Sequence, residues 1–126
     1  MRKILLLLGL LLILTASASA QKVIAEKAFT VKESGYTWFD FTFEQTTDLK
    51  GRSRATGGKN DIEVYILDSD NFENWKNGNE FRAYYSSGRV TVASFDVRLP
   101  KGTYHLVFSN RWAIMTPKAV SLWFYE

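Results

Sequence analysis

The sequence contains no cysteine and only one histidine among its 126 residues. Without cysteine the chain can form no disulfide bond, carries no thiol nucleophile and offers no thiol for lipid attachment. No serine lies in the nucleophile-elbow sequence that one large class of hydrolases needs. These absences predict a protein that is not an enzyme and whose stability comes from the packing of its core.

No long apolar run occurs after the first 20 residues, and the run near the N-terminus has the form of a secretory signal. Basic Arg2 and Lys3 are followed by an apolar run over 4–13 and by small residues that end at Ala20. We expect cleavage after Ala20, one domain over 21–126 and export to the periplasm or the medium. The alternative is a membrane anchor, but the run is shorter than the ~20 residues that a bilayer requires.

An excess of charge of one sign is also missing from the predicted mature domain. The whole chain has a formal net charge of +3 from sixteen basic and thirteen acidic residues. Loss of Arg2 and Lys3 leaves fourteen basic residues and a net charge of +1. A charge so close to zero argues against a polyanionic partner, and export argues against nucleic acid.

No stretch after Val23 keeps the spacing of an amphipathic helix for long, and period-two alternation dominates. We expect strands over 23–32, 36–43, 61–68, 81–85, 89–99, 103–109 and 120–125. The side chains expected to face the core from these strands are apolar or aromatic, and most of them are large. They are Val23, Ala25, Phe29, Val31, Phe39, Phe41, Phe43, Ile62, Val64, Ile66, Tyr104, Leu106 and Phe108.

Three segments between these strands carry further predictions. The polar and basic stretch over 44–60 predicts a long exposed loop. Residues 71–76 predict one short helical turn that covers an end of the core, with Asp70 or Asn71 as its N-cap. In the strand over 89–99 the apolar positions change from even to odd numbers, which predicts a bulge near Ala93 and Ser94.

Short strands without alternating helices predict an all-β fold, a two-layer antiparallel β-sandwich of about seven to eight strands. A small closed barrel is the alternative. The chain shows no internal repeat and no low-complexity tract.

Three segments of the second half carry a recognisable outline. They are Gly57-Gly58-Lys59-Asn60-Asp61, then Gly102-Thr103-Tyr104 leading into Val107-Phe108-Ser109-Asn110, then Lys118-Ala119-Val120. The outline resembles the GOLD (Golgi dynamics) domain, a jelly-roll-like β-sandwich, and the GOLD-like sandwiches of small exported bacterial proteins of unknown role. In the eukaryotic secretory pathway such proteins are cargo adaptors with a paired cysteine. This chain has no cysteine, so the resemblance implies the fold and not the adaptor role.

The one histidine, His105, is expected on the outward face of its strand as a solvated surface side chain. A hydrolytic triad would need Ser86, Ser87 or Ser109 beside it and a carboxylate behind it.

Carboxylate and amide oxygens cluster near the end of the strand over 61–68. Asp68, Asp70 and Asn71 are the candidate calcium ligands, although the turn lacks the residue order of an EF-hand. Capping of the helical turn explains Asp70 and Asn71 without a metal ion, and we favour it. We otherwise expect no cofactor.

Aromatic side chains fall on the outward phase of several strands, where they could stack on sugar rings or bury against a partner. They are Tyr36, Trp38, Tyr65, Tyr84, Trp123 and Tyr125. Basic Lys50, Arg52, Arg54 and Lys59 could bind an anionic glycan, a lipid headgroup or nucleic acid, but a solvated flexible loop is the favoured interpretation. Trp112, beside Arg111, is either an exposed contact or a plug over the end of the sandwich together with Ile114 and Met115.

We therefore expect an exported, non-enzymatic β-sandwich that binds a protein or an envelope component through its loops and one aromatic face. The candidate ligand-binding residues are Trp112, Arg111, His105, Trp38, Trp123 and Tyr125. A carbohydrate-binding module is the first alternative and a small hydrolase the second. We expect no nucleic-acid partner and no membrane span.

Overall fold

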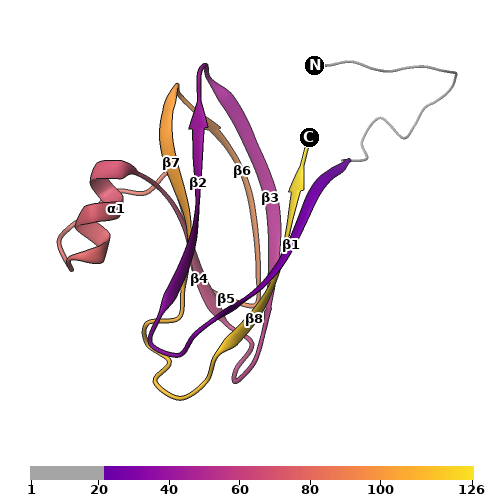
Figure 1. The fold of residues 1–126 in the computed structure, drawn as a ribbon, viewed down its shortest axis with the longest axis vertical. Helices are drawn as coiled ribbons and strands as arrows, with labels where there is room; N and C mark the ends of the chain where they lie inside the picture. Colours follow the sequence, from indigo (N-terminus) through magenta and orange to yellow (C-terminus); the bar gives the residue numbers. More distant parts are fainter. Residues whose placement is uncertain (1–21) are drawn as a thin grey trace, which may run out of the picture.

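The computed structural model describes residues 22–126 and shows two four-stranded sheets packed against each other, with one helix on the outside (Figure 1). The elements are β1 (Val23–Val31), β2 (Tyr36–Phe43), β3 (Thr47–Thr56), β4 (Ile62–Asp68), α1 (Ser69–Lys76), β5 (Tyr85–Val90), β6 (Val92–Leu99), β7 (Gly102–Ser109) and β8 (Lys118–Tyr125). Sheet A has the order β1-β8-β3-β6 and sheet B the order β2-β7-β4-β5. The predicted two-layer antiparallel β-sandwich is confirmed. The two sheets remain separate, so the alternative of a closed barrel is wrong.

The signal predicted over residues 1–20 lies outside the described residues. Within 22–126, no helix is long and apolar enough to cross a membrane.

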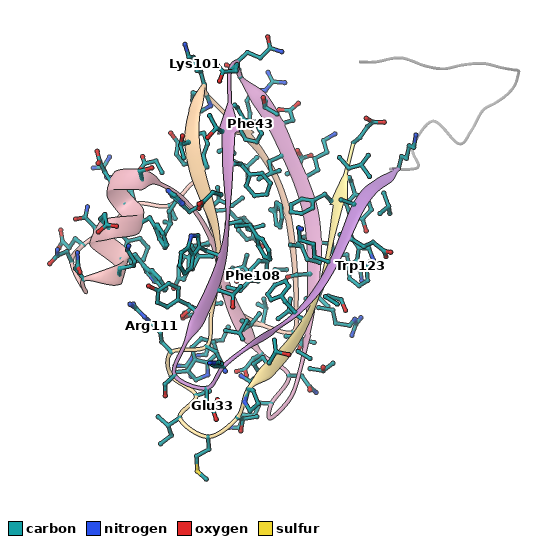
Figure 2. All side chains as sticks on the ribbon, in the orientation of Figure 1. Glu33, Phe43, Lys101, Phe108, Arg111 and Trp123 are labelled. Atoms are coloured by element: carbon teal, nitrogen blue, oxygen red, sulfur yellow. The ribbon has the colours of Figure 1, made fainter. Side chains whose placement is uncertain are left out.

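The core lies between the two sheets, and Figure 2 shows Phe108 from β7 inside it. Edge-to-face contacts join Phe29 to Phe108 and to Phe39, with ring centroids 5.0 and 5.1 Å apart. The predicted inward side chains of β2, β4 and β7 pack there. Val23 and Ala25 were expected in the core but are exposed, because the start of β1 extends past the edge of sheet B (Figure 1).

The loop predicted over 44–60 is wrong, because β3 is a central strand of sheet A between β8 and β6. Its buried side chains are mostly too small to produce a hydrophobic alternation; they are Leu49, Gly51, Ser53 and Ala55. A Cβ atom on Gly51 would lie 2.3 Å from the Phe95 ring. Gly51 is therefore required by packing across the sheet.

The predicted strands over 81–85 and 89–99 are also corrected. β5 and β6 belong to different sheets and are separated by Thr91 alone. The change from even to odd apolar positions is thus the crossing from sheet B to sheet A and not a bulge at Ala93 and Ser94. Residues 81–84 precede β5 and form no strand.

Helix α1 begins at Ser69, two residues earlier than predicted, and its N-cap is Asp68 rather than Asp70 or Asn71. Phe72 and Trp75 are buried as expected. The helix, however, covers the outer face of sheet B rather than an end of the core (Figure 1). The reason is that β4 and β7 carry apolar side chains on both faces; those on the outer face are Tyr65, Leu67 and Val107, all buried with Phe72 and Trp75.

Candidate functional site

The single aromatic face expected from the sequence is divided between the two sheets. Tyr36 and Trp38 lie on the outer face of sheet B beside α1, where their rings contact Trp75 and Phe72 at 4.9 and 5.6 Å. Trp123 and Tyr125 lie on β8 in sheet A. The candidate residues Trp38, Trp123 and Tyr125 therefore cannot contact one ligand on one face.

On sheet B, the exposed residue Arg111 contacts the end of α1 through its guanidinium. Its guanidinium lies 4.0 Å from the centroid of the Trp75 ring and 5.2 Å from that of Tyr36. It donates hydrogen bonds to the backbone oxygens of Trp75 (3.1 Å) and Lys76 (2.9 Å). Figure 2 shows Arg111 below α1, beside the sheet. A cation on the last carbonyls of a helix is favourable, so the contacts of Arg111 are structural.

The expectation that His105 is a solvated surface side chain is wrong, because that side chain is only 12 % exposed. Its ring stacks on Phe72 with centroids 4.5 Å apart. His105 Nδ1 lies 2.6 Å from Asp40 Oδ1, and His105 Nε2 lies 3.0 Å from Ser69 Oγ. The partner is thus Ser69 at the start of α1 and not Ser86, Ser87 or Ser109.

Asp40, His105 and Ser69 have the order of polar groups found in a hydrolytic triad. They also have a structural role, because they join β2, β7 and the first residue of α1. The Asp40 side chain is 61 % exposed, so solvent screens its charge. The arrangement shows a hydrogen-bonded link between helix and sheet.

The candidate calcium ligands Asp68, Asp70 and Asn71 lie at the start of α1. Asp68 Oδ1 accepts hydrogen bonds from the backbone N–H and the side-chain amide of Asn71, both at 2.9 Å. Asn71 Oδ1 in turn accepts the backbone N–H of Arg82 at 2.8 Å. No group of three or more His, Cys, Asp or Glu side chains able to hold a metal ion occurs in residues 22–126. Calcium binding at this turn stays a prediction.

Trp112 is half-buried between two cations. The Arg89 guanidinium lies 4.3 Å from the centroid of its ring and the Lys118 ammonium 5.1 Å from it. These contacts favour the plug over the exposed contact. Ile114 and Met115 do not share this position, because both are exposed.

The polar group beneath Trp112 was missed at the sequence level. Lys118 is buried, and its ammonium donates to the backbone oxygen of Asp61 (2.7 Å), to Asp61 Oδ1 (3.0 Å) and to Asn110 Oδ1 (2.9 Å). Buried Asn110 donates to the backbone oxygens of Lys32 (3.2 Å) and Thr116 (2.8 Å). This network ties three connecting segments together at one end of the sandwich.

The outer face of sheet A brings together two groups that the sequence analysis kept apart. Lys50, Arg52 and Arg54 point outward from β3, opposite in phase to its buried residues. Arg52 is the register partner of Trp123, and Lys50 is the register partner of Tyr125. The basic residues expected in a loop thus lie beside the aromatic pair of β8. We name these five residues the Trp123 face.

Hollows flank Trp123 on this face. One of about 560 Å³ is lined by side chains that include Lys50, Arg52, Asp96 and Tyr125. Two others, of about 300 and 310 Å³, share Ala28 and Ser121; the first includes Trp123 and the second includes Arg54. Figure 2 shows Trp123 on the outer side of β8, away from α1. The face is therefore open along the length of β8.

Hydrogen bonds fix the groups at the border of the Trp123 face. Trp123 Nε1 donates to Glu26 Oε1, which holds the indole ring in place. Asp48 pairs with Arg98, whose Nε donates to Asp48 Oδ1 at 2.9 Å. This hydrogen bond is the main cause that lowers the pKa of the Asp48 carboxyl. Within residues 22–126, no salt bridge engages Lys50, Arg52 or Arg54.

No family model matches the chain. The crystal structure of Yersinia pseudotuberculosis-derived mitogen is similar, with a TM-score of 0.52 and 13 % identity over 83 % of this chain and 86 % of that chain. A structure described as "CBM4 structure and function" has a TM-score of 0.35 and 16 % identity over 84 % of this chain and 74 % of that chain. At these identities the likeness to the mitogen shows a shared β-sandwich fold and nothing about the ligand.

Proposed function

We propose that the protein is a non-enzymatic binding module that holds a carbohydrate chain across the Trp123 face. The observation that carries the proposal is the position of Trp123, an outward ring with open hollows beside it on sheet A. Export, predicted from the N-terminal sequence, would bring this face into contact with envelope or extracellular glycans.

The chemistry of the Trp123 face suits a sugar. A sugar ring presents a C–H face that packs on an indole, and its hydroxyl groups need donors and acceptors at the rim. Arg52, the register partner of Trp123, supplies donors next to the ring. Asp96 supplies acceptors farther out, on β6 beyond β3. Small neighbours, Ala28 and Ser121, leave the space above β1 and β8 open.

Sheet B offers a less suitable surface for such a chain. Helix α1 covers its centre, and Arg111 is engaged by Trp75 and Lys76. Trp38 alone among its tryptophans is widely exposed, at 44 %. A protein partner that buries Trp38 is the second candidate, because a large exposed ring at the edge of a covered face is a common contact.

The experiment compares two tryptophans on opposite faces. The variants Trp123→Ala and Trp38→Ala would each be tested on a glycan array and by retention on immobilised polysaccharides. We expect at least a tenfold loss of retention for Trp123→Ala and a change within twofold for Trp38→Ala, with both melting curves still cooperative. Unchanged retention of Trp123→Ala, or the absence of glycan binding by the wild type, would overturn the proposal.

The hydrolase alternative is tested separately at Ser69. Its chemistry would be attack of Ser69 Oγ on an acyl carbon, with His105 taking the proton and Asp40 orienting the ring. We expect no labelling of the protein by a fluorophosphonate probe, since the carboxylate is exposed to solvent. Labelling that disappears in Ser69→Ala would show an enzyme and contradict a purely binding role.

A further inference from the structure

Three cations occupy alternate outward positions of one central strand. Lys50, Arg52 and Arg54 follow one another on β3, with one inward residue between each pair. Residues two apart on a strand are about 7 Å apart on the same face. The three charges therefore form a column along the middle of sheet A, and each repels its neighbour.

The neighbouring strands do little to offset this repulsion. Across the sheet, Arg52 is opposite Ser94 on β6, and Arg54 is opposite Ser121 on β8. Two acidic residues lie next to Lys50: Asp96 is opposite it on β6, and Asp48 is two positions before it on β3.

Asp48 and Glu26, the third acid of this outer face, each have a hydrogen-bond partner outside the three cations. Asp48 pairs with Arg98, and Glu26 accepts the hydrogen bond of Trp123. The predicted net charge of +1 for the mature chain conceals this local excess of positive charge.

From this column we infer that the ligand of the Trp123 face is a linear acidic polysaccharide, a conclusion that rests on the carbohydrate-binding function proposed above. Its carboxylates would pair with Lys50, Arg52 and Arg54 while a sugar ring stacks on Trp123. Arginine binds carboxylates through two parallel N–H groups, which gives such pairs orientation as well as energy.

A single-stranded nucleic acid is the other anionic polymer to consider. Such chains stack successive bases on several rings inside a continuously positive groove. On this face Asp96 lines the main hollow and would repel phosphates, whereas it can accept hydrogen bonds from sugar hydroxyls. We therefore favour the polysaccharide, and an oligonucleotide serves as a competing ligand in the test.

The test compares two polymers that differ in charge but not in backbone, and it adds two further polyanions of different backbone. The full-length mature protein would be titrated with polygalacturonate, with its methyl ester, with alginate and with a thymidine oligonucleotide. We expect the acid form of polygalacturonate to bind at least tenfold more tightly than the ester. We also expect its affinity to fall severalfold as the salt concentration rises from 50 to 500 mM, because salt screens exposed charges.

Variants then separate charge from stacking. The double variant Arg52→Gln/Arg54→Gln should lose the preference for the acid form, whereas Arg98→Gln, which changes an arginine of the same face already paired with Asp48, should keep it. Trp123→Ala should lower the affinity for the acid and for the ester by the same factor.

Each contrary result has a distinct meaning. If the acid and the ester bind with equal affinity, and both lose affinity in Trp123→Ala, the inference of an acidic ligand is overturned. The proposed carbohydrate-binding function would still hold. If the acid form binds Trp123→Ala as tightly as the wild type, the stacking of a sugar ring on Trp123 is overturned, and only the role of the cations is supported. Tighter binding of the oligonucleotide, or no binding of either acidic polysaccharide, overturns the inference.

Discussion

At the scale of single residues, Lys118 is the most demanding position of the fold. It is the one lysine buried among residues 22–126, and its three hydrogen bonds all end on Asp61 and Asn110. An ammonium taken out of water is tolerated only when such partners surround it. The network therefore makes one end of the sandwich depend on a single charge.

We predict that Lys118→Met, which keeps the length of the side chain and removes its charge, lowers the free energy of unfolding by about 3 kcal/mol. The Asp61 carboxylate and Asn110 Oδ1 would lose their donor, and Trp112 would lose a cation. Urea unfolding measures the change, with Lys101→Met in an exposed turn as the matched control. A loss below about 1 kcal/mol would mean that water replaces the ammonium at Asp61.

Lys118 also shows how much of a site the sequence reveals at this scale. It has the same phase as the buried Val120, Leu122 and Phe124, which was the available signal for an inward lysine. Its partner Asp61 lies 57 residues away, and only the fold brings the two together. The Ser69 and His105 pair, 36 residues apart, was missed for the same reason.

At the scale of elements, the attachment of α1 depends on Arg111. The eight-residue helix is too short to be stable alone, so its packing on sheet B must hold it. Arg111 contributes two hydrogen bonds to the last carbonyls and a planar cation over Trp75. Lysine keeps the charge but lacks the planar fork that makes both contacts.

We predict that Arg111→Lys lowers stability by about 1–2 kcal/mol. Amide hydrogen exchange should rise within α1 more than within β7, because the helix loosens before the core opens. The control is Arg82→Lys, an exposed arginine in the segment after the helix. Exchange that rises equally in α1 and β7 would show that Arg111 supports the whole sandwich instead.

Elements with large apolar residues at alternate positions could be predicted from the sequence, and β2, β4 and β7 are examples. β3 could not, because its inward positions include Gly51 and Ser53, whose burial is a property of their neighbours on β6 and β8. The position of α1 was missed because the outward residues of β4 and β7 were assigned from the sequence to a solvent-exposed face. In the structure, α1 covers the apolar residues among them. The same error hid the Trp123 face, since its cations belong to β3.

At the scale of the whole molecule, the two outer faces have different roles. Helix α1 covers the centre of the outer face of sheet B, where Phe72 and Trp75 pack on Tyr65, Leu67 and Val107. Sheet A has no such cover, and its polar, cationic and aromatic side chains remain open around the hollows. A second hydrophobic cluster thus lies on the outer side of sheet B, and the proposed ligand site lies on the outer side of sheet A.

Buried tyrosines make the stability of the whole sandwich sensitive to alkaline pH. Burial is the main cause that raises the pKa of Tyr65 above its usual value of 10.0, and the nearby Glu63 raises it further. Burial likewise raises the pKa of Tyr85. In the unfolded chain both phenols return to their usual value, so above it the unfolded state binds fewer protons than the folded state. Stability is therefore fully present below pH 10 and is lost as the pH rises through the folded pKa values.

We predict that the melting temperature is nearly constant between about pH 7 and pH 9 and falls as the pH rises above about 10, as scanning calorimetry would show. The variant Tyr65→Phe/Tyr85→Phe should have a lower melting temperature at neutral pH, because two phenol groups, one of them next to Glu63, are lost. Its further decline with pH should be shallower than that of the wild type, since two groups no longer release protons on unfolding. Tyr125→Phe, at a half-exposed tyrosine of sheet A, should decline as steeply as the wild type. Parallel declines in all three proteins would assign the alkaline transition to another group, with Tyr104 the first to examine because burial raises its pKa as well.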